Sequence, residues 1–275
     1  MSDKDREIEE LKREISRLVK ELSRLSPQLS SLLKMRGYHM YKTEPPEPPI
    51  LPGDRFVGQY YDLLKHYSFR LFLRDVIRKK EGFSIKDVSR FTDEIKAKEY
   101  TDELLRLGIA GDNEGLFRLN QQEARSFGPT LEWFVAEVLH REYGIEAKWG
   151  LRFKRANVGG DYDVIAKMGT AVMYIEVKSS PPKQVYQSEI SAFFKRIDDL
   201  FPEIAVFLMD TELRMKDKIV PMFEEELSER ASDEEVVRME KELFQISNRI
   251  FIINSKGGID RNIEKVLRWY FLYNR

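Results

Sequence analysis

Apolar and polar side chains alternate most regularly in two short runs near the middle of the chain. The runs 162–167 and 171–178 are rich in strand-favouring residues, and Met168-Gly169-Thr170 between them is a turn signal. Side chains alternate faces along a strand, so every second residue of the later run shares a face. One face then carries Tyr174, Glu176 and Lys178, and the other is apolar. The pattern predicts a β-hairpin with one apolar and one chemically active face.

A second pattern, with spacings of three and four residues, occupies the N-terminal segment. Its apolar positions are Ile8, Leu11, Ile15, Leu18, Leu22, Leu25, Leu29 and Leu32. This is the seam of a coiled coil over roughly four heptads, and isoleucine at a with leucine at d favours two parallel strands. We therefore expect residues 1–36 to form a coiled-coil helix that joins two copies of the chain. The alternative is a helix that packs on its own protein, with a break near Pro27.

Two regions follow this helix. Residues 37–58 contain closely spaced prolines, which prevent regular helix, so we expect a stiff linker. In 59–124, apolar spacing predicts helices over 69–80 and 92–107, a short capped helix between them and a hairpin after them. That order is typical of a winged helix-turn-helix. The second long helix begins with mixed charges, which leaves open whether this domain contacts DNA or a protein partner.

The C-terminal part, 125–275, predicts an α/β domain. Amphipathic spacing predicts a helical insertion over 212–247, rich in charged residues. The continuous apolar run 250–253 is typical of a fully buried strand, and 259–273 predicts a closing amphipathic helix. The expected fold class is α/β, with a mixed sheet flanked by helices.

Composition restricts the chemistry. The 275 residues include no cysteine and three widely spaced histidines, which excludes thiolate chemistry and argues against a zinc site. Any metal must then be bound by oxygen. The net charge is −1, so attraction to nucleic acid must come from local basic patches. The chain has no membrane-length apolar run and no signal-like start, so we expect a cytoplasmic protein without a membrane partner.

The polar face of the hairpin suits a hard cation. If the strands pair about Gly169, Asp163 lies opposite or nearly opposite Glu176, with Lys178 beside them. Mg²⁺ takes a few carboxylate oxygens and keeps several waters, which leaves positions for phosphate oxygens. A bound metal polarises the phosphate and activates water, while a nearby lysine orients that water or stabilises developing charge. The alternative is an ordinary solvated Glu-x-Lys pair.

The segment Asp-Tyr-Asp-Val-Ile, a tight turn and then Ile-Glu-Val-Lys-Ser-Ser resembles the PD-(D/E)xK nuclease superfamily. Archaeal Holliday-junction resolvases and Mrr-like restriction endonucleases belong to that superfamily. The resemblance implies a restriction-endonuclease-like fold, with a helix at 127–143 before the hairpin, a helix at 184–200 and a strand at 204–210 after it. The resemblance thus covers about residues 128–210 of this chain.

The resemblance also implies roles for individual residues. Asp163, Glu176 and the carbonyl of Val177 are expected to bind Mg²⁺ or Mn²⁺, Lys178 to act on the water, and Glu132 to assist from the preceding helix. Some choices remain open. Asp161 shares a face with Asp163, and Glu137 lies on the same helix as the assisting acid; Gln184 and Gln187 are both candidates for a glutamine that some members carry.

Basic residues flank the expected site and could grip phosphates, or could be ordinary surface charges. They are Lys154, Arg155, Lys183, Lys195 and Arg196. The leading hypothesis is a metal-dependent nuclease that hydrolyses DNA phosphodiester bonds as a dimer. The alternatives are a catalytically inactive nuclease-like scaffold that binds DNA, and a winged-helix transcription regulator.

Overall fold

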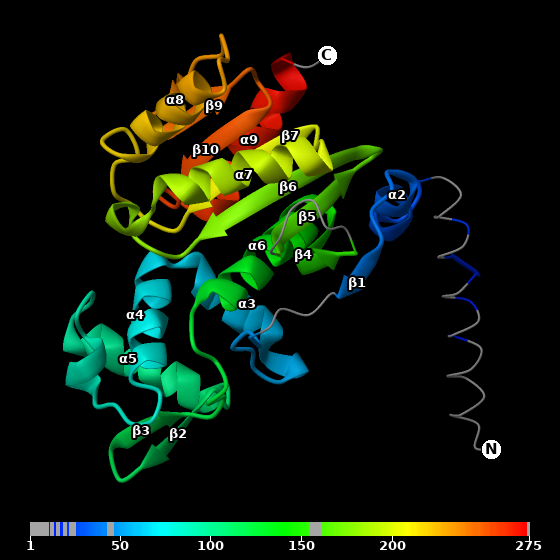
Figure 1. The fold of residues 1–275 in the computed structure, drawn as a ribbon. Coiled ribbons are helices and arrows are strands. Elements are labelled where there is room, and N and C mark those ends of the chain that lie inside the picture. The colour runs from blue at the N-terminus through cyan, green and yellow to red at the C-terminus, as the bar shows by residue number, and fades with distance from the viewer. Residues whose placement is uncertain are drawn as a thin grey trace.

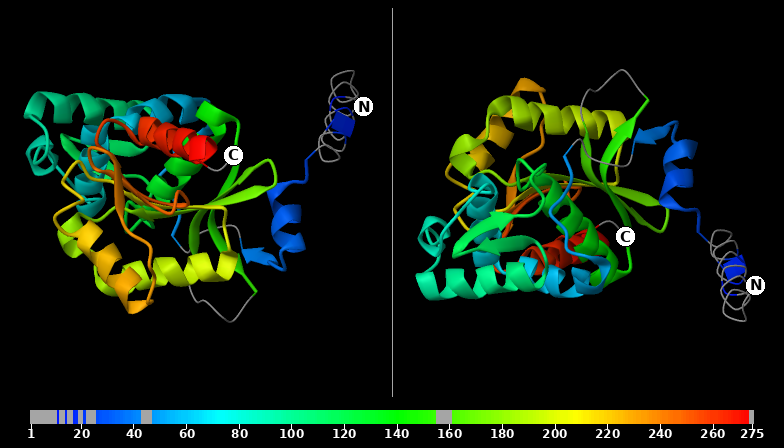
Figure 2. Two further views of the ribbon diagram at one scale, coloured as in Figure 1. Left: turned by 90° about the horizontal axis from the view of Figure 1, so that it is seen from above. Right: turned by 90° about the horizontal axis from the view of Figure 1, so that it is seen from below.

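The computed structural model describes residues 11, 14, 17, 18, 21, 26–42, 47–154 and 161–273. In this part of the chain an eight-stranded mixed sheet, of order β1-β4-β5-β6-β7-β10-β9-β8, lies between two layers of helices (Figures 1 and 2). The strands are β1 (Met40–Lys42), β4 (Glu146–Phe153), β5 (Tyr162–Met168), β6 (Ala171–Lys178), β7 (Ile204–Met209), β8 (Val237–Glu240), β9 (Leu243–Ile246) and β10 (Ile250–Asn254).

Strand directions place the candidate site residues at the adjacent ends of two neighbouring strands, β5 and β6. β5 and β6 are antiparallel and turn at Gly169, whose φ of 62° favours glycine. Their register pairs Val164 with Ile175, and one further step places Asp163 opposite Glu176. β6, β7 and β10 are parallel, so their carboxyl ends lie together. The predicted hairpin is therefore confirmed.

Helices cover the two faces of the sheet separately (Figure 2). One face holds α3 (Val57–Lys65), α6 (Gly128–Tyr143) and α9 (Ile259–Tyr273), and the other holds α2 (Leu29–Met35), α7 (Gln187–Leu200) and α8 (Ile219–Glu229). Alternate residues of β6 serve the two cores: Met173 and Ile175 join the first, and Val172 and Tyr174 join the second. Both faces of β6 are therefore buried, which agrees with its nearly continuous apolar run.

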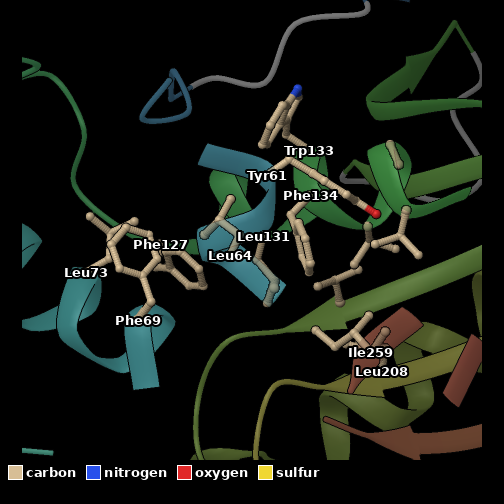
Figure 3. Close-up of a cluster of buried hydrophobic side chains, with 14 of the residues drawn as sticks. Tyr61, Leu64, Phe69, Leu73, Phe127, Leu131, Trp133, Phe134, Leu208 and Ile259 are labelled. Carbon is tan, nitrogen blue, oxygen red and sulfur yellow. The ribbon is translucent and has the colours of Figure 1, made fainter. Parts of the chain in front are cut away.

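The middle region, below the sheet in Figure 1, contains the predicted elements. They are α4 (Tyr67–Arg78), the 3₁₀ turn η2 (Ile85–Val88), α5 (Glu94–Arg106) and the hairpin β2 (Ala110–Asn113) and β3 (Leu116–Leu119). Ser84 and Asp87 form the expected capping box. Phe69 and Leu73 of α4 belong to the same buried cluster as Phe127 and Leu131 beside α6 (Figure 3). The middle region and the sheet therefore share one continuous core.

The predicted helical insertion 212–247 is wrong in its second half. Only α8 is an α-helix there, and 237–246 forms the β8–β9 hairpin, which extends the sheet through pairing of β9 with β10. The apolar residues Val236, Met239, Leu243 and Ile246 have helix-like spacing. Backbone pairing with β10 overrides that spacing, and Lys241 turns the chain with a positive φ.

The N-terminal expectations have mixed outcomes. Most residues of the predicted coil lie outside the described residues, and Leu11 and Leu18 are exposed. Leu29 and Leu32, at the end of the predicted seam, are instead buried against the α7 face of the sheet. The range 37–58 is also more than a linker, because β1 pairs with β4 and η1 (Asp54–Phe56) leads into α3.

No helix in the described part of the chain is both long and apolar enough to cross a membrane.

Candidate active site

The hairpin brings the predicted acids and lysine to the ends of β5 and β6. The Val177 N–H donates a 2.7 Å hydrogen bond to Asp163 Oδ2, which fixes Asp163 beside the Glu-x-Lys segment. Because the N–H and C=O of one strand residue point to the same neighbouring strand, the Val177 carbonyl also faces the β5 side. Asp163, Glu176 and Lys178 thus occupy one small region, as the spacing predicted.

A cleft of about 850 Å³ opens beside these residues. Its lining includes Glu132, near the start of α6, together with Asp161 and Asp163. The same cleft is lined by Lys80 of the middle region and by Arg125 in the segment that leads into α6. The candidate site therefore lies between the sheet and the middle region.

The cleft carboxylates repel one another. Burial raises the pKa of Glu132 to about 7, and the negative charges of Asp161 and Glu176 add to the rise. Burial also raises the pKa of Asp163 well above its ordinary value, with Glu176 and Glu132 contributing in the same direction. A divalent cation would relieve this repulsion.

Glu176 is connected to α7 through its ion pair with Arg196. Its side chain is 3% exposed. Oε2 accepts hydrogen bonds from the Tyr174 hydroxyl and from Arg196 Nη1, the latter at 3.2 Å. The Lys178 ammonium lies 2.9 Å from Glu176 Oε1 and also 2.9 Å from Glu189 Oε2. Burial alone would lower the pKa of Lys178, but Glu176 and Glu189 outweigh it and raise that pKa above its ordinary value.

The chemical types of the expected ligands match those that Mg²⁺ prefers. Two carboxylates and a backbone carbonyl, completed by water, match the oxygen ligands that Mg²⁺ uses. Asp163 and Glu132 line the same cleft, and Glu176 lies opposite Asp163 in the hairpin register. Among the described residues, no three acidic or imidazole side chains form a ready-made metal site.

Three of the predicted basic residues that the structure describes do not line the cleft. Arg155 lies outside the described residues, and Lys154, Lys183 and Lys195 are exposed; the cleft lining of the described chain includes none of these three. Arg196 lies on the side of α7 that faces β6, where its side chain is 14% exposed and pairs with Glu176.

The structure also shows the contacts of the alternative site residues Asp161, Glu137 and Gln187. Asp161 pairs with Arg152 through two guanidinium contacts, and Glu137 pairs with Arg141 on its own helix. Gln187 donates to the Met222 carbonyl of α8, on the side away from the cleft lining.

Sequence reasoning missed Glu189 as a neighbour of the site, and it did not predict that Arg196 pairs with Glu176. Glu189 and Arg196 are seven residues apart, two helical turns, and so share the face of α7 that meets β6. That spacing was a usable signal.

No protein-family model and no curated protein sequence matches this chain. Solved structures that are similar to this chain include the following two. Protein VC1899 from Vibrio cholerae is 12% identical, with 89% of this chain and 61% of that chain covered, at a TM-score of 0.49. Can2 from Sulfobacillus thermosulfidooxidans, in complex with cyclic tetra-adenylate, is 14% identical, with 88% of this chain and 60% of that chain covered, at a TM-score of 0.52.

This chain thus spans less than two thirds of either neighbour. At such low identity, the likeness to Can2 concerns the fold alone. The chain has an α/β fold with a large mixed sheet flanked by helices.

Proposed function

We propose that this chain is a Mg²⁺- or Mn²⁺-dependent nuclease of the PD-(D/E)xK type, which hydrolyses DNA phosphodiester bonds. The observation that supports the proposal most is the hydrogen bond from Val177 to Asp163. It brings an acid of β5 to the backbone between Glu176 and Lys178, at the edge of an open cleft.

Each residue has a distinct task in this proposal. Asp163, Glu176 and the Val177 carbonyl hold the cation. The bound cation supplies Lewis-acid polarisation of the phosphate and lowers the pKa of water. Lys178 places a positive charge beside the attacking water or the developing phosphate charge. Glu132 lines the same cleft as Asp163 and would assist from α6.

The cleft limits the substrate that reaches the carboxylates. Its volume of about 850 Å³ is that of a pocket for a medium-sized ligand, so it fits a short segment of one strand. Arg125 is exposed in the lining and suits contact with a neighbouring phosphate. We therefore propose that a strand enters the cleft between α6 and the middle region, which we assign as a winged helix-turn-helix.

Cleavage assays test the proposal directly. End-labelled single strands, duplexes, flaps and four-way junctions are incubated with Mg²⁺ or Mn²⁺ and with wild-type, Glu176→Ala or Lys178→Ala protein. We expect wild-type cleavage of at least one substrate and a loss of about 10²-fold or more in both variants, since each removes a group aimed at the reacting phosphate. Glu225→Ala, which changes an exposed acid on α8, is the control and should cleave normally.

Two outcomes would contradict the proposal. Retained cleavage by Lys178→Ala would remove this lysine from the mechanism. No cleavage by folded wild-type protein, with and without cyclic tetra-adenylate, the ligand in the Can2 complex, would favour the non-catalytic scaffold.

A further inference from the structure

The lone pairs of the Glu176 carboxylate are already shared among donors. Oε1 faces Lys178 Nζ at 2.9 Å and Arg196 Nη1 at 3.4 Å, and Oε2 faces the Tyr174 hydroxyl and the same guanidinium nitrogen. An ionised carboxylate offers about four lone-pair sites. A metal can therefore bind Glu176 only if one of these donors withdraws.

Lys178 is the donor best able to withdraw. Tyr174 is fully buried and packs edge-on against the Tyr162 ring and in a tilted contact against the Phe193 ring, at centroid distances of 5.3 and 5.7 Å. Arg196 is 14% exposed, and its planar guanidinium contacts both oxygens of Glu176 through Nη1. Lys178 is 19% exposed and ends in a compact ammonium on a flexible stem. It also has a second acceptor within contact distance.

That second acceptor, Glu189, is itself held in place. Its Oε1 accepts a 3.1 Å hydrogen bond from the Tyr186 N–H and thereby caps the start of α7. Its Oε2 is left at 2.9 Å from the Lys178 ammonium. Lys178 can therefore leave Glu176 without losing a negatively charged partner.

We propose that Glu189 is a positioning residue that takes over the Lys178 ammonium when Glu176 releases an oxygen to a divalent cation. The transfer frees a ligand and keeps the ammonium in the site. This inference rests on the proposed function, because it requires that Glu176 bind a metal. Without Glu189, Lys178 would stay on Glu176 and compete with the metal.

Calorimetric titration of the full chain with Mn²⁺ tests this competition. Wild type, Glu189→Gln, Lys178→Met and the double variant form a double-mutant cycle. We expect Glu189→Gln alone to weaken Mn²⁺ binding on the order of tenfold, as is usual for partners of metal ligands. In the Lys178→Met background the same substitution should have little effect, since no ammonium competes for Glu176.

The cycle separates positioning from other roles of Glu189. A generic charge effect or a purely structural role would weaken Mn²⁺ binding equally in both backgrounds, and that result would overturn the inference. Asp198→Asn is the matched control: it makes the same charge change on α7, but Asp198 is exposed and pairs with Arg230. Its Mn²⁺ affinity should equal that of wild type.

Failure of the inference and failure of the proposed function give different results. A wild type that binds no Mn²⁺ overturns both. A wild type that binds Mn²⁺ with unchanged affinity in Glu189→Gln overturns only the role of Glu189. The glutamine keeps an oxygen for the Tyr186 N–H; if that variant does not fold, Glu189→Asp, which keeps the charge but shortens the reach to Lys178, should show the same dependence on Lys178.

Discussion

Two charged clusters lie at the ends of neighbouring parallel strands, and they are built in opposite ways. At the end of β6, Glu176 and Lys178 adjoin the cleft carboxylates. Directly after β7, Asp210 is fully buried against Arg70 and Arg74 of α4. The Asp210 N–H donates a 2.8 Å hydrogen bond to the Lys178 carbonyl, so the two clusters are adjacent.

Their pKa shifts run in opposite directions. Burial alone would raise the pKa of Asp210, but Arg70 and Arg74 outweigh it and hold that pKa below its ordinary value. At Asp163 and Glu132, burial and neighbouring carboxylates act together and raise both pKa values. A buried acid surrounded by cations contributes to stability, whereas one surrounded by acids is costly until a ligand compensates it.

Replacement of Arg70 by methionine should have the largest effect on stability. Arg70 contacts Asp210 through Nε and Nη2 and donates from Nη1 to the Leu64 carbonyl. Loss of one partner from a buried pair typically costs about 3–5 kcal/mol. Denaturant unfolding of wild type and Arg70→Met measures this loss.

The control for this experiment is Arg106→Met. Arg106 forms an exposed pair with Glu103 on α5, and such pairs contribute less than about 1 kcal/mol. If Arg70→Met costs no more than Arg106→Met, the Asp210 cluster does not hold the middle region on the sheet.

Glu132→Gln should stabilise the protein, in contrast to Arg70→Met, and the size of this effect should depend on pH. The pKa of Glu132 is raised from 4.5 to about 7, so the folded state binds the proton more tightly than the unfolded state. Wild-type stability then falls as the pH rises from about 4.5 through about 7, whereas the glutamine variant lacks this loss. Above that window the variant should be more stable by about 1–3 kcal/mol, since one pKa unit corresponds to about 1.4 kcal/mol.

Unfolding of both proteins between about pH 5 and about pH 8, in EDTA, measures the difference. Glu137→Gln is the control on the same helix, because Glu137 pairs with Arg141 and should give a curve parallel to that of wild type. Parallel curves for Glu132→Gln as well would mean that the cleft acids do not repel one another as described.

The sequence predicted the elements around the hairpin because local signals and tertiary structure agree there. The turn at Gly169 and the period-two alternation specify β5 and β6, and the helix at 127–143 and the strand at 204–210 are confirmed within a residue or two. In 237–246 the local signal misleads, because helix-like spacing is overridden by pairing with β10. Likewise, the leucine spacing at Leu29 and Leu32 could not show which surface covers them.

The sequence predicted the part of the candidate site that lies on the strands β5 and β6, but not the contacts that α7 adds to it. Adjacency of Asp163 and Glu176 follows from the hairpin register alone. The contacts of Glu189 and Arg196 depend instead on how α7 packs on β6. Their spacing places them on one face of the helix but does not show which strand that face meets. Charge type was also insufficient, since Arg196 looked like a surface phosphate contact and the structure pairs it with Glu176.

The smallest effect is expected for Arg74→Met. Arg74 Nη2 contacts both the carboxylate and the carbonyl of Asp210, but its buried Nε has no hydrogen-bond partner among the described residues. An unsatisfied buried donor costs about 1–3 kcal/mol, which offsets much of what the ion pair contributes. At neutral pH we therefore expect the free energy of unfolding to change by no more than about 1 kcal/mol, because Arg70 still compensates Asp210.

In acid the variant should differ from wild type. Without Arg74, the folded-state pKa of Asp210 moves up towards its ordinary value, so the variant loses stability at a higher pH as the solution is acidified. Acid-unfolding curves measure this shift, and a loss at neutral pH as large as that of Arg70→Met would mean that both arginines are needed to compensate one carboxylate.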